Sequence, residues 1–374
     1  MTRINILKVL STISIFLVLL VFIGFSSTRL LSSRKQLFVQ GAASSEIAYS
    51  SAILGGFKGL IADILWLRIT ALQTDHKLLE LMELSELVTK LEPHIAEVWT
   101  FHAWNLSYNI SLLADSKEDK WNWVKQGIEL LRDKGLEINP GDPILALELA
   151  WIFQHKIGTD GADKYGEFYR TEWVKDISSY LGENGSIPEA DSLVAVELEQ
   201  GFKLSPSIMA EIENQFGKID WRCPHAHALY WGWIAHKSNN KNTKLRSIRM
   251  VYSSAVKLSL DQGRIIGDPL ADDWKYQAAP NHNLIVATHN FIRECLTSFD
   301  SPGIKNMFVG FTWTACNILY RLNNVELADE IYKSFCSSFI GYNFPELNTF
   351  IQGSDEVNAI GYAIDQNLIK LNFQ

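Results

Sequence analysis

The chain of 374 residues is 47% hydrophobic and 20% charged, and its net charge is −8. This composition provides for a substantial buried core and excludes a globally disordered chain, while the length suits one continuous solenoid better than one small compact domain. The charge balance argues against nucleic acid as a partner, because phosphate binding requires clustered Lys and Arg and the sequence has no basic stripe.

The N-terminus carries the clearest single pattern. Residues 9–28 contain no charged side chain, and almost all of those before Ser26 are apolar. Twenty residues at about 1.5 Å each span about 30 Å, the thickness of a bilayer core. We therefore predict a short basic segment over residues 1–8 and an uncleaved transmembrane helix over residues 9–28. A cleaved signal peptide is the alternative, since Gly24 and Ser26 are small residues at the spacing of a cleavage site.

The charges that flank this predicted anchor do not decide its orientation. The basic residues are nearly balanced, with Arg3 and Lys8 before the apolar run and Arg29, Arg34 and Lys35 after it. A short basic N-terminus before an export-like segment usually stays in the cytoplasm. We therefore expect the bulk of the chain on the opposite side, and we expect it to be soluble because no second apolar run of comparable length follows.

The rest of the sequence divides into a linker and a helical region. Residues 29–56 contain the breaker-rich stretches GAASS and Gly55-Gly56, which predict a connecting segment. Over residues 57–374 the apolar residues recur with helical spacing, and strand-like alternation is scarce. Gly, Pro, Asn and Asp mark three pieces as non-helical: residues 181–190, 217–224 and 261–283.

The helical region contains degenerate repeats of paired helices. A tetratricopeptide unit is two antiparallel helices in about 34 residues, with small residues where the helices approach closely. A proline ends the second helix, because it cannot continue the backbone ladder. If Pro93 closes one unit, the next has a large residue at Trp99 and small residues at Ala103 and Gly135, and Pro140 closes it. The extra length of this unit falls in a charged turn, where a solenoid tolerates insertions.

Three later segments repeat this pattern more weakly. Their matching large and small residues are Leu149, Ala150 and Phe153; then Trp231, Gly232, Tyr252 and Ala255; and finally Cys316, Ala328 and Tyr332. Four matches in order along the chain predict an all-α protein in which an N-terminal transmembrane helix precedes an α-α superhelical solenoid.

On these residues the chain resembles tetratricopeptide repeat proteins, which commonly bind peptides or proteins in a concave groove. More narrowly, it resembles membrane-anchored repeat proteins of planctomycete- and verrucomicrobia-type bacteria, a family with no established activity. The narrower resemblance rests on residues 54–68, 90–109, 123–140, 149–158 and 220–231, and it thins toward the C-terminus. It implies a single-pass protein of the bacterial inner membrane whose soluble domain lies on the periplasmic side.

Five residues fall at groove-facing positions of the first helix in their units. Trp104, Trp151 and Trp233 are equivalent to one another, and Gln154 and His236 follow one turn later in two of the units. Three indoles on one concave face would anchor a peptide, since Trp offers a large contact area and one donor. The alternative is that imperfect repeats bury these indoles between neighbouring helices, with Gln154 and His236 as ordinary surface residues.

The sequence offers no catalytic, cofactor-binding or metal-binding constellation. Cys223, His225 and His227 could suggest a metal site, but the sequence has no matching second pair of ligands. The two histidines would also point apart on a helix. We therefore expect these residues to cap and pack the start of a helix. The chain contains no GxSxG, HExxH, Walker or dinucleotide-binding pattern. None of its four cysteines forms a CxxC pair, which favours small buried hydrophobic residues.

The leading hypothesis is a membrane-anchored scaffold that binds partner proteins or peptides in a concave groove, without a cofactor or metal. A second hypothesis is an enzyme, a hydrolase or lyase acting on carbohydrate, with its site in a cavity of the solenoid. A third is a structural subunit of an envelope or export complex. A pocket containing two carboxylates or a His–acid pair would favour catalysis, whereas an aromatic groove without such pairs favours binding.

Overall fold

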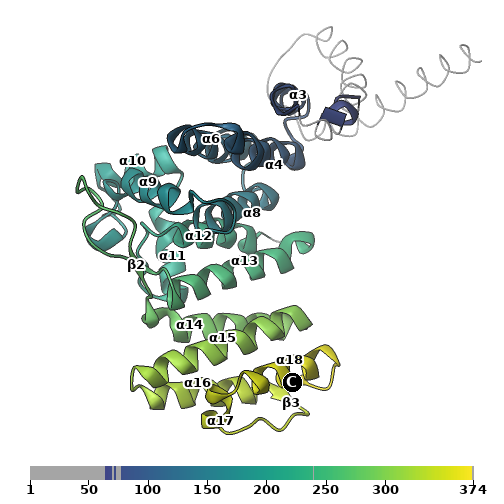
Figure 1. The fold of residues 1–374 in the computed structure, drawn as a ribbon, viewed down its shortest axis with the longest axis vertical. Coiled ribbons are helices and arrows are strands. Elements are labelled where there is room, and N and C mark those ends of the chain that lie inside the picture. Colours follow the sequence, from purple (N-terminus) through teal and green to yellow (C-terminus); the bar gives the residue numbers. More distant parts are fainter. Residues whose placement is uncertain (1–63, 70, 73–76, 239, 373–374) are drawn as a thin grey trace, which may run out of the picture. The chain divides into compact units, whose positions relative to one another are not determined.

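The computed structural model describes residues 64–69, 71–72, 77–238 and 240–372. Nearly all regular structure in these residues is helical (Figure 1), which confirms the predicted all-α class. The chain divides after Val98 into two compact units. The predicted N-terminus (1–8), anchor (9–28) and linker (29–56) lie outside the described residues. Within the described residues, no helix combines the length and the apolar character needed to cross a membrane.

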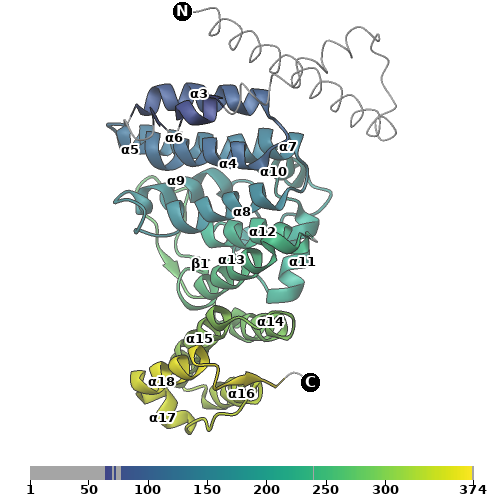
Figure 2. The same ribbon diagram turned by 90° about the vertical axis from the view of Figure 1, so that its right-hand side faces the viewer.

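The helices of the chain are short to medium in length. Residues 64–69 and 71–72 are helical. The α-helices that follow are α3 (Leu78–Leu91), α4 (Ala96–Trp104), α5 (Ser111–Leu113), α6 (Lys117–Glu129), α7 (Leu136–Ile138), α8 (Pro143–Trp151), α9 (Gly166–Ser178), α10 (Leu193–Phe202), α11 (Pro206–Phe216), α12 (Pro224–Lys237), α13 (Lys241–Leu260), α14 (Ile285–Ser298), α15 (Pro302–Arg321), α16 (Val325–Ser337), α17 (Leu347–Gln352) and α18 (Ser354–Asp365). In the second unit α12 packs between α8 and α13, and α14 follows on α13 (Figure 2).

Three helices of the second unit contain a π-helical segment. These segments are η1 (Asn105–Ile110) between α4 and α5, η2 (Leu130–Gly135) between α6 and α7, and η3 (Ile152–Ile157) after α8. A π-helical turn is wider than an α-helical turn and occurs frequently at functional sites. Because η3 continues α8 directly, the two form one rod of mixed geometry. Two 3-10 turns, η4 (Glu183–Gly185) and η5 (His282–Leu284), lie between helices.

The helix ends follow the signals in the sequence. Pro93 and Pro140 lie between helices, as predicted, and Pro224 begins α12. In the three pieces predicted to be non-helical, residues 181–190, 217–224 and 261–283, only Pro224 belongs to an α-helix. The Asp142 carboxylate caps α8 by accepting hydrogen bonds from the Ile144 and Leu145 backbone N–H groups at 2.8 and 3.2 Å. This cap fixes where the rod of α8 and η3 starts.

The small residues predicted at helix contacts are buried in the core. Ala103, Ala150, Cys316 and Ala328 have no exposed surface, and Ala255 is 1% exposed. Large side chains fill the space around them, and Trp221, Tyr169 and Phe153 are among the largest fully buried ones. Alternating small and large residues in this way allow helix backbones to approach closely while the core remains densely packed.

Gly127 marks one such close approach, between α6 and η1. A Cβ atom at this position would overlap Ser107 Oγ and lie 2.9 Å from the Ala103 carbonyl oxygen. We expect Gly127→Val to lower the free energy of unfolding by about 1–3 kcal/mol, because the backbone oxygen cannot move aside without separating the helices. Urea denaturation measures this loss. Gly201→Val on α10, where a Cβ atom would meet nothing within 4 Å, is the control, and an equal loss in both variants would contradict the packing argument.

Short strands close two loops of the second unit. β1 (Arg264–Ile265) pairs antiparallel with β2 (Ala278–Ala279), and β3 (Phe339–Ile340) pairs antiparallel with β4 (Lys370–Leu371). The Asp220 carboxylate joins the first pair to the start of α12. It accepts hydrogen bonds from the Ile265 backbone N–H at 2.8 Å and from the Arg222 guanidinium at 2.7 and 2.8 Å. This bridge fixes the first turn of α12, which carries His225.

Candidate binding pocket

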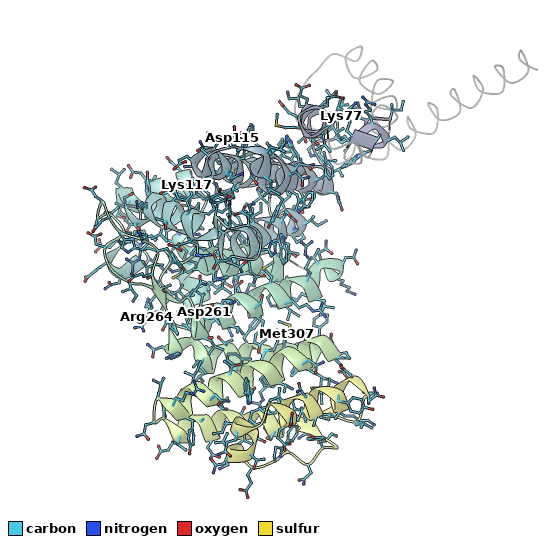
Figure 3. All side chains as sticks on the ribbon, in the orientation of Figure 1. Lys77, Asp115, Lys117, Asp261, Arg264 and Met307 are labelled. Carbon is cyan, nitrogen blue, oxygen red and sulfur yellow. The ribbon has the colours of Figure 1, made fainter. Side chains whose placement is uncertain are left out.

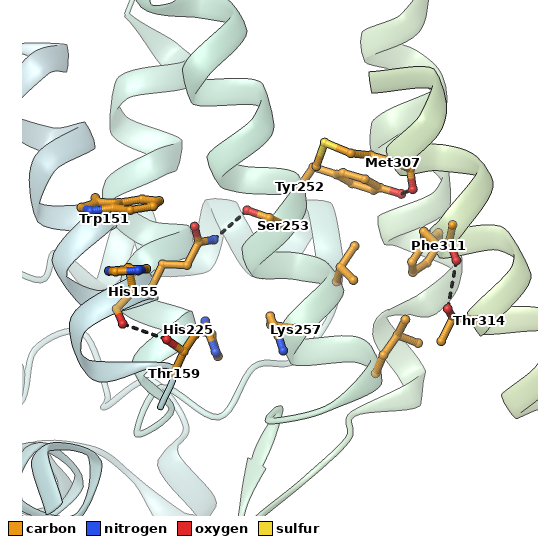
Figure 4. A pocket seen from close by; sticks show the side chains of 14 residues that line it. Trp151, His155, Thr159, His225, Tyr252, Ser253, Lys257, Met307, Phe311 and Thr314 are labelled. Atoms are coloured by element: carbon orange, nitrogen blue, oxygen red, sulfur yellow. Dashed lines mark hydrogen bonds between the residues drawn. The ribbon is translucent and has the colours of Figure 1, made fainter. Parts of the chain in front are cut away.

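A strongly apolar hollow in the second unit lies where α8–η3, α13 and α15 meet. It has a volume of about 490 Å³, and the three elements each contribute a stripe of side chains on one helical face. The stripes are Trp151, Gln154, His155 and the following Thr159; Ser253, Val256, Lys257 and Leu260; and Met307, Gly310, Phe311 and Thr314. Tyr252 and His225 complete the lining. We call this hollow the aromatic pocket; Figure 4 shows it, and Figure 3 marks Met307 on the whole chain.

The walls of the aromatic pocket are hydrocarbon and aromatic because most of its polar groups already have partners. Gln154 Nε2 donates hydrogen bonds to Ser253 Oγ at 2.6 Å and to Ser254 Oγ at 3.2 Å. The Tyr252 hydroxyl donates to the Met307 carbonyl at 3.3 Å. The Gln154 bonds tie η3 to α13, and the Tyr252 bond ties α13 to α15. These hydrogen bonds therefore hold the three elements together around the hollow.

Trp151 forms the most exposed aromatic surface of the pocket. The indole is 36% exposed, and it stacks on the His155 ring with centroids 4.6 Å apart and planes 9° apart. Burial lowers the pKa of His155, and the neighbouring Lys156 lowers it further. The imidazole is therefore neutral near pH 7 and extends the apolar platform begun by the indole.

A ladder of rings continues from this platform to α4. The Tyr108 and His155 centroids are 5.8 Å apart, as are those of Trp104 and Tyr108. The Tyr108 hydroxyl lies 3.3 Å from His155 Nδ1, and neutral His155 can accept the hydrogen bond it donates. Burial, and secondarily Glu148, raises the pKa of Tyr108, so the phenol keeps its proton. The two middle rings of this ladder, Tyr108 and His155, lie in the π-helical segments η1 and η3.

The structure separates the five predicted groove residues into two places. Trp151 and Gln154 line the aromatic pocket, and Trp104 joins them through the ring ladder. Trp233 and His236 line a different hollow of about 510 Å³, together with side chains from α11 and α14. The Trp233 indole is only 6% exposed and stacks with His236 at 5.7 Å. The structure therefore does not bring Trp233 together with Trp151 in one hollow.

Sequence reasoning did not identify the contributions of α13 and α15. Both helices present residues at i, i+3, i+4 and i+7, starting from Ser253 and from Met307. This spacing is visible in the sequence and indicates one face of a helix. It does not say that the two faces meet, because mixed stripes of Ser, Lys, Met and Thr also occur on solvent-facing helices. His155 was also missed, although it follows Trp151 by four residues, a spacing that places two side chains on one face of a helix.

The titratable side chains that line the aromatic pocket are His155, His225, Tyr252 and Lys257. None of its described lining residues is Asp or Glu. Among the residues that the structure describes, no group of three or more His, Cys, Asp or Glu side chains is arranged to hold a metal ion. Near the start of α12, His225 faces the pocket, whereas His227 contacts the Phe153 and Trp173 rings. The surface that the hollow offers is mostly apolar.

The fold and the pocket together define an all-α protein with a preformed aromatic pocket between helices. No protein-family model matches the chain, and no curated protein or solved structure matches it.

Proposed function

We propose that this chain is a membrane-anchored, tetratricopeptide-like scaffold that binds partner proteins or peptides, with the aromatic pocket as the seat of a peptide side chain. One observation carries the proposal: three helical stripes converge on a half-open apolar hollow whose largest ring, Trp151, remains 36% exposed. Trp is enriched among the few residues that contribute most of the binding energy at protein interfaces, and such residues lie in apolar pockets.

Further features support the repeat architecture and the tether. Buried small residues at Ala103, Ala150 and Cys316 occupy the helix contacts that a tetratricopeptide-like pattern requires. The uncharged run over residues 9–28 suits a single transmembrane helix. A short N-terminus before such a run suits an orientation with the soluble part on the periplasmic side of a bacterial inner membrane. A tethered pocket would hold its partner within reach of the membrane surface.

Gly310 allows the pocket to be closed without damaging the fold. It lies in the interior of α15 and lines the pocket, and a Cβ atom there would meet nothing within 4 Å. A leucine at this position fills part of the hollow, and it also favours the helix by roughly 0.5–1 kcal/mol relative to glycine. Gly310→Leu should therefore block the pocket in a protein at least as stable as the original.

The test is a selection of random ten-residue peptides against the full chain in detergent micelles. We expect peptides with a shared large apolar or aromatic residue, whose affinity falls at least tenfold with Gly310→Leu and with Trp151→Ala, consistent with a lost interface anchor worth about 2 kcal/mol. Gly201→Leu, the same change at another open helical glycine, is the control and should leave affinity unchanged. If all selected peptides bind Gly310→Leu as well as the original chain, the pocket is not the site.

A further inference from the structure

One end of the aromatic pocket is polar, unlike its walls. Thr159, His225 and Lys257 gather there (Figure 4). The His225 ring touches Gly158, the neighbour of Thr159, so that a Cβ atom on Gly158 would lie 2.7 Å from His225 Cε1. Lys257 acts electrostatically on the same imidazole. The remaining walls, including Trp151 and Phe311, are rings and hydrocarbon. A bound group would therefore meet an apolar slot that ends in hydrogen-bonding side chains.

His225 is the least satisfied of these polar groups. Its side chain is 0% exposed, and neither ring nitrogen has a hydrogen-bond partner of standard geometry in the described chain. Burial lowers its pKa to about 4, with Lys257 adding to the effect and Asp261 and the Gly158 backbone opposing it. The imidazole is therefore neutral near pH 7 and offers one donor and one acceptor. A ligand that pairs with this imidazole would therefore bind more tightly than one that leaves it unpaired.

The charges around this end select a neutral ligand group over an anion. Lys257 is the only cation among the described lining residues, and its ammonium already lies 3.0 Å from the Asp261 carboxylate. A second carboxylate or a phosphate would compete with Asp261 for that ammonium and would be repelled by it. A hydroxyl group brings no charge, and it can donate to one partner and accept from another, as neutral His225 requires.

We propose that the side chain seated in the aromatic pocket is a tyrosine, whose ring stacks along Trp151 and whose hydroxyl hydrogen-bonds to His225. This inference rests on the proposed peptide-binding function and specifies the anchor residue. A phenol ring matches an apolar slot with aromatic walls, and its hydroxyl lies at the far end of the ring, where the polar groups gather. Phenylalanine would fill the same slot but leave His225 unpaired.

The test compares three blocked tripeptides, acetyl-Ala-X-Ala-amide, on the full chain in detergent micelles, by saturation-transfer NMR. With X as tyrosine the affinity should exceed that with phenylalanine by about threefold to tenfold, the range of one neutral hydrogen bond. With X as 4-carboxyphenylalanine the affinity should be lower than with tyrosine. A tighter complex with the carboxylate would overturn the proposal, because the polar end would then recognise an anion.

His225→Leu should abolish the preference for tyrosine while retaining the phenylalanine peptide. His227→Leu is the matched control, since His227 lies two residues further on α12, is 1% exposed and faces Phe153 and Trp173 instead of the pocket. As a second measurement on the unaltered chain, the ring nitrogen resonances of His225 should shift with the tyrosine peptide and not with the phenylalanine peptide. Equal affinity for both peptides refutes the tyrosine anchor alone, whereas selected peptides that are insensitive to Gly310→Leu refute the pocket itself.

Discussion

Asp163→Ala is expected to lower the free energy of unfolding by about 3–5 kcal/mol, the largest loss we expect from any single substitution in this chain. Asp163 is the counter-ion of Lys156. The ammonium lies 2.6 Å from Asp163 Oδ2, and the two side chains are 0% and 8% exposed. Without the carboxylate, Lys156 must either keep a buried charge with no opposite charge beside it or lose its proton. Burial already lowers the pKa of Lys156, and the Asp163 carboxylate opposes that shift.

The surroundings of this ion pair make the loss hard to compensate. The Tyr169 hydroxyl donates to the same Oδ2 atom at 3.0 Å and would lose its acceptor as well. Lys156 Nζ lies 5.3 Å from the Tyr108 ring centroid and 5.6 Å from that of Tyr169, so aromatic rings occupy space that water would need. The cluster therefore depends on every member being present.

Equilibrium urea denaturation measures the effect. Asp176→Ala is the matched control, because it breaks the Lys125–Asp176 pair at 2.9 Å, whose side chains are 38% and 37% exposed. Exposed pairs contribute about 0–1 kcal/mol. The double variant Lys156→Met/Asp163→Leu should recover most of the stability, since it removes both charges. Equal losses for Asp163→Ala and Asp176→Ala would show that burial is not the source of the effect.

Acid is expected to destabilise the fold well before most carboxylates are protonated. Burial lowers the pKa of His225 and His289 to about 4 and that of His227 to about 3. In the unfolded chain a histidine binds its proton near pH 6.5. Between that pH and the folded-state values the unfolded state binds more protons, so stability falls as the pH falls, by on the order of 3 kcal/mol per histidine. Glu148, whose pKa is raised by burial, contributes with the opposite sign.

His227→Leu should remove one part of this acid sensitivity. Its ring is 1% exposed and lies between Phe153 and Trp173, with centroids 5.1 and 4.8 Å away, so a leucine can occupy much of the same space. The free energy of unfolding, measured from pH 7 to pH 4, should fall less steeply in this variant. Phe153→Leu disturbs the same cluster without removing a titrating group and should keep the original slope. Parallel curves for His227→Leu and the unaltered chain would exclude this histidine as a cause.

Much of the fold follows from local signals. Pro93 and Pro140 end helical segments because proline cannot continue the backbone ladder, and their positions were sufficient to place the turns. Ala103 and Ala150 were recognised as contact residues because only small side chains permit close helix packing. Helix-ending prolines and small contact residues can both be recognised from a residue and its neighbours along the chain, so the sequence is sufficient to find them.

The candidate site was only partly predictable, because it depends on which helices become neighbours. Trp151 and Gln154 were found from their positions in the predicted repeat. Trp233 occupies the equivalent position on α12, but α10 and α11 are inserted before that helix, and α11 packs against it and lines the hollow that Trp233 faces. Phe311 enters the aromatic pocket from α15 on account of long-range packing, which no local spacing encodes.

The π-helical segment η3 affects how the lining of the aromatic pocket can change during evolution. A π turn holds one more residue than an α turn, so the side chains beyond it are rotated by about 100° from where an uninterrupted helix would place them. Deletion of one residue between Ile152 and Ile157 would return this segment to α-helical geometry. The direction of the Thr159 side chain would then change, whereas that of the Trp151 indole, which precedes the segment, would not. Such a deletion would therefore change the polar side chains at this end of the aromatic pocket without changing the residue that forms its main aromatic wall.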